Sequence, residues 1–369
     1  MELVVRKNDL LKELSLLQGI VERKNTIPIL ANVLLEADST HVSLLATDLD
    51  VGLRSKCEAT VAKSGTLTLP AKKLFEIVSA LPDNSEIRIE EDKGGKSVTV
   101  AADRFESRMQ TLPATEFPTP PQEGGTAEAT LPGPGLKRMI SHTRFAITSE
   151  DTRYFLNGAQ LVLRPDSMSM VATDGHRLAF MSVHESPGKG VKSEVLLPRK
   201  TLNEVARLTD GNSPVEFSQG ENHLFFRADG RLLISRKIDA NFPAYERVIP
   251  KSNDKRIEFD RDRLAAAVRR VRLLSNERSK AVKFVVGKDQ VEITSSTPEV
   301  GEAHEVLSVD YAGSPMQICF NADYVDNFLS VVETEAVQLE FKDEMSQAVM
   351  KPVGGDGYEY TYVIMPMRI

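Results

Sequence analysis

Apolar positions along the chain repeat one local pattern three times. Each time, a short apolar run leads directly into a segment whose apolar residues recur every three or four positions, which predicts a strand followed at once by an amphipathic helix. The three segments are 67-LTLPAKKLFEIVSAL-81, 195-VLLPRKTLNEVARL-208 and 318-ICFNADYVDNFLSVV-332. Leu69, Leu197 and Phe320 occupy matching positions, 128 and then 123 residues apart. Such nearly constant spacing indicates three similar structural units.

A second helix is predicted about 60 residues before each of these segments. The three stretches are 8-NDLLKELSLLQGIV-21, 134-PGLKRMISHTRFAI-147 and 260-DRDRLAAAVRRVRLLS-275. Apolar residues recur in them at helical spacing, Pro134 suits a first helical turn, and Asp260 or Asp262 suits a helix start.

The remaining segments alternate or cluster Val, Ile, Leu and Thr between turn residues, which predicts antiparallel strands joined by hairpins. The clearest runs are 42–53, 86–102, 168–180, 215–228, 282–294 and 337–351. We therefore expect an α+β protein of three similar domains, each with two helices packed on antiparallel sheets. The Gly- and Pro-rich segment 118–130 and the segment 249–256 are typical of linkers, which places the domains at 1–122, 129–249 and 251–369.

Composition narrows the class of protein. A chain of 369 residues with 41% hydrophobic residues can build several cores. No apolar run is long enough to cross a bilayer, and the N-terminus lacks the uninterrupted apolar segment of a secretory signal, so a cytoplasmic location is expected. The net charge of −7 disfavours a simple nucleic-acid binder. Basic residues nevertheless recur at the starts and along the faces of the predicted helices, so similar units related by rotation could present a common basic surface.

The segment 171-VATDGHRLAF-180 is the strongest candidate for chemistry, because Asp174 and His176 could ligate a metal or share a proton. It corresponds to 45-LATDLDVGLR-54 in the first repeat and to 293-ITSSTPEVGE-302 in the third. The aspartate is matched only in the first repeat and the histidine in neither, so the shared feature is a strand running into a turn. No phosphate-binding loop, dinucleotide fingerprint, zinc motif or nucleophile elbow accompanies it. A metal-dependent hydrolase using Asp174 and His176, and a repeat scaffold that never binds DNA, remain the alternatives.

The residues of several motifs, and the order of these motifs along the chain, resemble those of one known family. VATDGHRLA, RYFLNG, LLPRK, NFPAYERV, LSNE and the terminal YVIMPMRI, together with the three repeats, closely resemble the bacterial DNA sliding clamps, the beta subunits of DNA polymerase III. The resemblance covers the whole chain. It implies the DNA clamp fold and a head-to-tail dimeric ring that encircles duplex DNA without sequence specificity and acts as a processivity factor.

The resemblance also implies the partners. They are double-stranded DNA, a second copy of the chain, the catalytic subunit of the replicative polymerase, the clamp loader and other replication and repair proteins that carry a clamp-binding motif. It implies no cofactor, no metal, no membrane attachment and no catalytic activity.

Three groups of site residues are carried over from the resemblance. A cleft that docks a peptide of the Gln-x-x-Leu-Phe kind is expected at Arg153, Leu156, Thr173, Gly175, His176, Arg177, Leu178, Pro243, Arg247, Val248, Val363, Met365, Pro366, Met367 and Arg368. The DNA-facing residues are expected to be Lys24, Lys72, Lys73, Lys137, Arg138, Arg199, Lys200 and Arg269. Ring closure is expected between Lys73, Arg104 and Met109 on one side and Leu273, Leu274, Glu299, Glu302 and Glu305 on the other.

Overall fold

The computed structural model describes residues 1–21, 26–125, 127–148, 151–208 and 212–368. Their contacts divide the chain into two compact units. The first comprises Met1–Pro134 with Lys200–Lys237, and the second comprises Gly135–Arg199 with Ile238–Ile369. The second sequence repeat thus contributes residues to both units. The domain limits 1–122, 129–249 and 251–369 follow the sequence repeat, and they stay a prediction.

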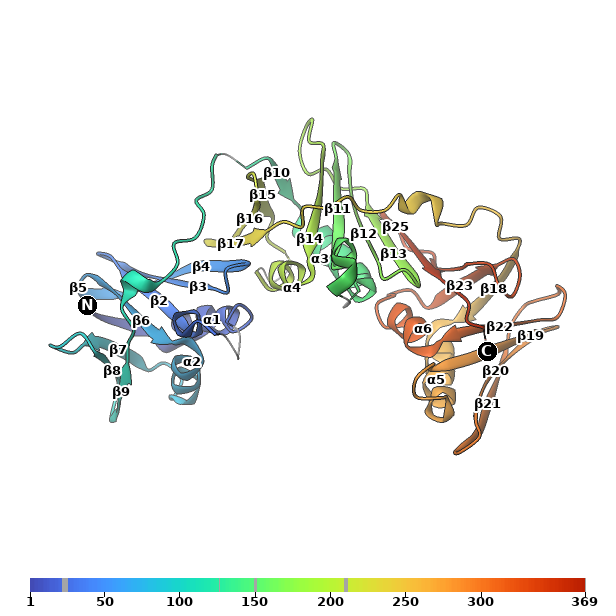
Figure 1. The fold of residues 1–369 in the computed structure, drawn as a ribbon, viewed down its shortest axis with the longest axis horizontal. Coiled ribbons are helices and arrows are strands. Elements are labelled where there is room, and N and C mark those ends of the chain that lie inside the picture. Colours follow the sequence, from blue (N-terminus) through green and yellow to red (C-terminus); the bar gives the residue numbers. More distant parts are fainter. Residues whose placement is uncertain (22–25, 126, 149–150, 209–211, 369) are drawn as a thin grey trace. The chain divides into compact units, whose positions relative to one another are not determined.

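Two antiparallel sheets form the first unit (Figure 1). The five-stranded sheet runs in the order β5 (Thr60–Lys63), β1 (Glu2–Arg6), β7 (Glu86–Glu91), β8 (Ser97–Ala102) and β9 (Phe105–Gln110). The eight-stranded sheet runs in the order β10 (Ala129–Leu131), β15 (Val215–Gln219), β16 (His223–Ala228), β17 (Arg231–Arg236), β4 (Val51–Glu58), β3 (His41–Thr47), β2 (Asn32–Ala37) and β6 (Gly65–Pro70). Because β17 pairs with β4, one sheet continues from the first repeat into the second.

Helices α1 (Lys7–Leu17) and α2 (Ala71–Ala80) pack against each other and against strands of the first repeat. Leu10, Leu14 and Leu17 lie on one face of α1 and are fully buried, as their spacing predicts. On the same helix, Glu13 forms a buried two-bond ion pair with Arg231 of β17, with N–O distances of 2.8 and 2.7 Å. The pair ties the first repeat to the second, and losing either partner would leave a buried charge uncompensated.

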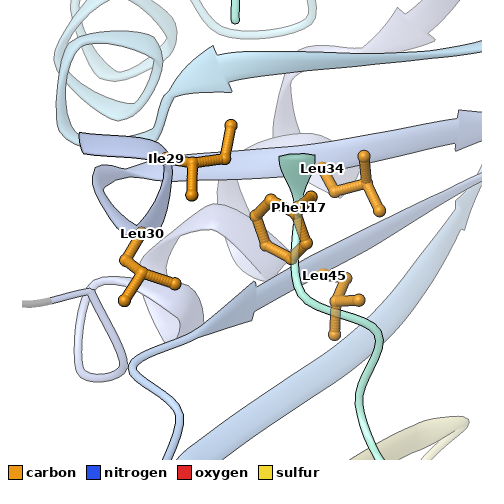
Figure 2. Packing of buried hydrophobic residues seen from close by; sticks show 5 residues of the cluster. All are labelled: Ile29, Leu30, Leu34, Leu45 and Phe117. Carbon is orange, nitrogen blue, oxygen red and sulfur yellow. The ribbon is translucent and has the colours of Figure 1, made fainter. Parts of the chain in front are cut away.

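The chain that leaves the first repeat is anchored in its core. Figure 2 shows Phe117, which follows the short 3₁₀ helix η2 (Ala114–Glu116), packed among Ile29, Leu30, Leu34 and Leu45. Ile29 and Leu30 come from a second 3₁₀ helix, η1 (Pro28–Ala31). The predicted linker at 118–130 therefore begins directly after a buried aromatic anchor.

Two further sheets form the second unit (Figure 1). The eight-stranded sheet runs in the order β14 (Ser193–Pro198), β11 (Gly158–Arg164), β12 (Ser167–Thr173), β13 (Arg177–Val183), β25 (Tyr358–Ile364), β24 (Ala348–Val353), β23 (Ala336–Phe341) and β18 (Lys255–Asp260). The four-stranded sheet runs in the order β21 (Gly301–Ser308), β20 (Gln290–Thr297), β19 (Ala281–Gly287) and β22 (Met316–Asn321). Here β13 pairs with β25, so a sheet again continues from one repeat into the next.

The six predicted helices are confirmed, with shorter ends. The remaining four are α3 (Gly133–Thr143), α4 (Arg199–Leu208), α5 (Arg261–Val271) and α6 (Ala322–Leu329). The predictions 134–147 and 260–275 overshoot because the last apolar residues belong to 3₁₀ turns, η3 (Arg144–Ala146) and η6 (Arg272–Leu274). Asp260, one of the two residues predicted to start this helix, caps α5 by accepting a hydrogen bond from the backbone N–H of Arg263. Within the described part of the chain, no helix is long and apolar enough to cross a membrane.

Candidate functional site

The segment 171–180 contains a tight polar turn between β12 and β13. The Thr173 hydroxyl accepts a hydrogen bond from the Gly175 N–H and donates one to the Arg177 carbonyl. One carboxylate oxygen of Asp174 accepts the backbone N–H groups of His176 and Arg177, at 2.9 and 3.1 Å. Gly175 has φ +87°, which favours glycine. Threonine, aspartate and glycine thus each have a conformational task in this turn.

The first repeat makes the same turn between β3 and β4. Thr47 and Asp48 form hydrogen bonds equivalent to those of Thr173 and Asp174. Leu49 takes the place of Gly175 and has φ +82° although it carries a side chain. In the third repeat, the matching segment has a different turn at Thr297–Gly301. The sequence interpretation of 171–180 as a strand running into a turn is therefore confirmed.

The hydrolase alternative finds no support in this geometry. One oxygen of Asp174 caps the turn, and the other accepts a hydrogen bond from Arg177 Nε at 3.0 Å. The His176 ring is exposed, and the described residues contain no group of three or more His, Cys, Asp and Glu side chains arranged to hold a metal. Asp174 is committed to holding the turn together.

Arg177 has one of the most buried cationic side chains described, with 9% of the side chain exposed. Besides Asp174, its guanidinium donates to Asn327 Oδ1 at 2.8 Å and to the Phe145 carbonyl at 2.6 Å. It also lies over the Tyr324 ring, 4.2 Å from its centroid. Burial alone would lower the pKa of Arg177, but Tyr362 and Asp174 outweigh it and raise that pKa above its ordinary value. The cation is fixed and permanently charged.

An apolar cluster lies beside the turn. Its buried members, Val171, Leu178, Val349 and Val363, come from β12, β13, β24 and β25. Partly buried side chains pack against them, namely Phe180, Phe242, Tyr245 and Ile249. Leu178 and Val363 are among the docking residues predicted from the resemblance. The aromatic residues of the cluster are not, although the motif NFPAYERV contains two of them. Burial raises the pKa of Tyr245 to about 12, so this ring stays neutral.

The other predicted docking residues lie on nearby segments of the second unit. Met365 donates its backbone N–H to the His176 carbonyl at 2.9 Å, which places the C-terminal segment beside the turn. Met367 donates its backbone N–H to the Cys319 carbonyl at 2.8 Å. A Cβ atom on Gly175 would lie 2.6 Å from Arg153 Nη1, so that guanidinium covers the turn. Leu156 is buried, Pro366 is half-buried, and Pro243, Arg247, Val248 and Arg368 are exposed.

The predicted DNA-facing residues differ in their surroundings. Lys24 lies outside the described residues. Lys72, Lys73, Lys137, Arg199 and Arg269 are exposed on or at the start of their helices. Four of these basic side chains have acidic neighbours: Lys72 and Lys73 with Glu76, Arg138 with Glu333, and Arg269 with Asp326. Lys200 is turned toward Asp48 and donates to the Ile20 carbonyl at 3.0 Å. Exposed ion pairs such as Lys73–Glu76 contribute little to stability, so the cations of such pairs can exchange partners.

Arg104, Met109, Glu302 and Glu305 lie at or beside the outer strands of two sheets, whereas Lys73 lies on α2, Leu273 and Leu274 lie in η6, and Glu299 lies in the turn before β21. β9 ends the five-stranded sheet and carries exposed Phe105, with Arg104 just before it. β21 ends the four-stranded sheet and carries exposed Val306, with Glu302 and Glu305 along it. Met109 of β9 is buried, Leu274 is half-buried, and Lys73, Leu273 and Glu299 are exposed. Free edges with apolar side chains are surfaces that natural proteins cover or pair.

Comparison with known families covers almost the whole chain. The family model described as DNA polymerase III beta subunit, N-terminal domain, matches residues 1–121. The model for the central domain matches 130–244, and the model for the C-terminal domain matches 246–368. The fold and these three consecutive matches define an accessory protein of a bacterial DNA polymerase.

Individual relatives belong to the same class of protein. The beta sliding clamp of Pseudomonas putida is 38% identical over 371 residues, and that of Escherichia coli K12 is 34% identical over 372, each with full coverage of both chains. A crystal structure of the Pseudomonas aeruginosa sliding clamp bound to griselimycin superposes with a TM-score of 0.93 at 35% identity, and that of Caulobacter crescentus with 0.91 at 35%, again with full coverage.

The chain belongs to the family of bacterial beta sliding clamps, the beta subunits of DNA polymerase III. It is a processivity factor of DNA replication, and membership of the family implies DNA and polymerase as partners and assembly into a dimeric ring.

Proposed function

We propose that two copies of this chain close head to tail into a ring around duplex DNA, without catalytic activity of their own, and act in the cytoplasm. The observation that carries the proposal is the pair of free edges, β9 and β21, each with an exposed apolar side chain. In a head-to-tail dimer each edge meets the other edge of the partner copy, so both are covered in a closed assembly. Basic Lys73 and Arg104 would then face acidic Glu299 and Glu302, which favours this orientation.

The DNA contact is proposed for the exposed basic side chains of the helices. Long Lys and Arg side chains that reach phosphates make weak, salt-dependent contacts that carry no sequence information. Lys72 and Arg199 are two such candidates, because both are exposed. Lys200 contributes less, because Asp48 already neutralises it. Retention would come from the closed ring rather than from tight binding.

The turn, the apolar cluster and the C-terminal segment together form the proposed docking surface. Val248 and Met365 are exposed apolar side chains at this surface, beside buried Leu178 and Val363. Apolar anchors surrounded by polar groups suit a short peptide, and methionine adapts to several of them. The catalytic subunit of the polymerase, the clamp loader and repair enzymes are the proposed bearers of such a peptide.

Retention on circular DNA tests the ring. Protein loaded on a nicked circle should stay bound at a salt concentration that removes ordinary phosphate contacts, and it should be lost when a restriction enzyme cuts the circle. Equal loss before and after cutting would show that no ring encloses the DNA. A scaffold that never binds DNA would fail to associate with the circle at any salt concentration.

A further inference from the structure

The two places where one repeat joins the next are built in the same way. The strand that follows the turn of one repeat pairs antiparallel with the last strand of the next repeat, β4 with β17 and β13 with β25. The corresponding strands without such a partner in the single chain are β21, which follows the turn of the third repeat, and β9, which ends the first. A second copy of the chain can supply to each of them the strand that the other repeats already have.

The first of these joints shows the register of the pairing. On the outer face of the sheet, which is the face away from α1 and α2, the last pair before the turn is Thr47 with Gly52. Strand β17 places Ile234 opposite Gly52. Two residues further along, it places Leu232 opposite Arg54. Residues two apart in a strand share a face, so both pairs between the repeats lie on the outer face.

The matching positions of β21 follow from its own hairpin. In the third repeat, the Ser295 hydroxyl donates to a carbonyl of α5, so the neighbouring Ser296 lies on the outer face. Ser296 pairs with Glu302, and this is the last outer-face pair before the turn. Glu302 therefore takes the place of Gly52, and His304 takes the place two residues further along.

The matching positions of β9 follow in the same way. Both β9 and β17 come after a two-residue turn that begins with an aspartate in the left-handed region, Asp103 with φ +51° and Asp229 with φ +50°. Counted from these turns, Arg108 takes the place of Ile234, and Glu106 takes the place two residues earlier. The side chains of Arg108 and Glu106 are exposed.

We propose that β9 of one copy pairs with β21 of its partner in this register, and that protonation of His304 strengthens the closed ring. The inference rests on the proposed ring. The register places Arg108 opposite Glu302, and it places Glu106 opposite His304. Directly opposite residues of an antiparallel pair are close enough for their charges to interact. Both pairs join opposite charges when the histidine carries a proton.

The groups around His304 are mainly acidic. Its Nδ1 lies 2.9 Å from Glu292 Oε1 on β20, and 72% of its side chain is exposed. The cavity of about 810 Å³ on this face of the sheet is also lined by Glu302 and by one cation, Lys283. Ring closure would add Glu106 directly opposite the imidazole, while the arginine of the same strand pairs with Glu302.

The helix side of β21 adds little to this balance. There Glu305 accepts two hydrogen bonds from Arg270 of α5, so the two charges largely cancel. Closure therefore places one more carboxylate beside the imidazole, which favours its protonated form. By linkage, protonation then favours closure. The added stability of the ring is present at acid pH and is lost as pH rises through about 5 to 8, the range in which histidine ordinarily titrates.

Sedimentation at about pH 6 and about pH 8 measures this coupling. The dimer dissociation constant of the parent protein should be about three- to thirtyfold lower at the acid pH, because each ring contains two such pairs. His304→Gln and Glu106→Gln should each remove this difference. His304→Lys, with a cation at both pH values, should keep the dimer firm at both. His184→Gln is the matched control, because His184 is exposed outside the two strands, and it should keep the parental difference.

Oxidative cross-linking tests the register separately. Directly opposite Cα atoms lie about 4.5–5.5 Å apart, within reach of a disulfide, whereas diagonal ones lie about 7–8 Å apart, beyond it. Glu106→Cys combined with His304→Cys should give covalent dimers, and Glu106→Cys combined with Glu302→Cys should give few. The parent protein, with Cys57 and Cys319 unchanged, is the blank.

The outcomes separate this proposal from the ring itself. A dimer with the same dissociation constant at both pH values, or a pH difference that survives in His304→Gln, would overturn the role of the histidine. More efficient cross-linking through Glu302→Cys than through His304→Cys would overturn the register. A parent protein that sediments as a monomer and is not retained on circular DNA would refute the proposed ring, and this proposal with it.

Discussion

Ring closure can be tested through one side chain. Leu273, in the 3₁₀ turn after α5, is 76% exposed in the single chain, which is unusual for a leucine. Among the proposed closure residues it has the most apolar surface to lose on dimerisation. Leu273→Ala should weaken the dimer while leaving the folded protomer intact, since the side chain makes few contacts within its own chain.

The size of the effect follows from this exposure. Burying a leucine side chain completely is worth about 1.5–3 kcal/mol, so burying about three quarters of it is worth roughly 1–2 kcal/mol. A head-to-tail dimer has two identical interfaces, and each contains one Leu273. The combined loss of about 2–4 kcal/mol corresponds to a dissociation constant roughly 30- to 700-fold higher.

Sedimentation over a dilution series measures that constant directly. Met345→Ala is the control, because Met345 is an exposed apolar residue of the same repeat outside the proposed interface. Adding Leu274→Ala should weaken the dimer further, and the unfolding midpoint of Leu273→Ala should stay at the parental value. A Leu273→Ala dimer with a dissociation constant within threefold of the parent would remove this residue from the interface.

Three further predictions concern DNA, peptide and pH. Replacing Lys72 and Arg199 by Glu should lower the amount of protein loaded on circular DNA at low salt and flatten the salt dependence of loading, while the unfolding midpoint stays unchanged. Deleting residues 365–369 should abolish peptide binding, and His176→Ala should only weaken it, because apolar anchors carry most of the affinity; calorimetry distinguishes the two. Burial lowers the pKa of His142 in the folded protein, so the unfolded chain binds the proton more readily and stability is lost as pH falls below about 6.5, the unfolded value. Urea midpoints at pH 7.5 and 5.5 should show this loss, and His142→Gln should reduce it.

Local sequence patterns predicted the helices and strands well, because the formation of these elements depends on residues close in sequence. The spacing of Leu10, Leu14 and Leu17 predicted the buried face of α1, and the choice of Asp260 or Asp262 placed the start of α5 within two residues. The ends of helices were predicted less well. Apolar residues continue past Thr143 and Val271, where the backbone tightens into 3₁₀ turns, and periodicity alone does not separate the two kinds of turn.

The pattern of hydrophobic and polar residues could not predict pairings between residues that are far apart in the sequence. The register that sets Leu178 opposite Val363 joins two repeats through strands far apart in the chain, and it brings the docking residues together. The buried state of Arg177 depends on Asn327, 150 residues away. A sequence in which arginine follows Asp-Gly-His predicts an exposed turn, and the resemblance carried this position over as a peptide contact.

The two equivalent turns lead to a last prediction about Gly175. Leu49 shows that this turn accepts a side chain at φ +82°, at a cost of roughly 1–2 kcal/mol for an L-residue. Gly175→Leu should therefore fold, with a net loss below about 2 kcal/mol, because replacing glycine also restricts the unfolded chain.

Peptide binding should suffer more than stability. The new Cβ would lie 2.6 Å from Arg153 Nη1, so the guanidinium must leave its place over the turn. It can do so because it is the end of a flexible side chain. We expect peptide affinity to fall about tenfold in Gly175→Leu, a change of roughly 1.4 kcal/mol. Arg153→Ala should cause a similar fall if the displaced guanidinium is the reason. If Gly175→Leu failed to fold, the turns of the first and second repeats would not be equivalent.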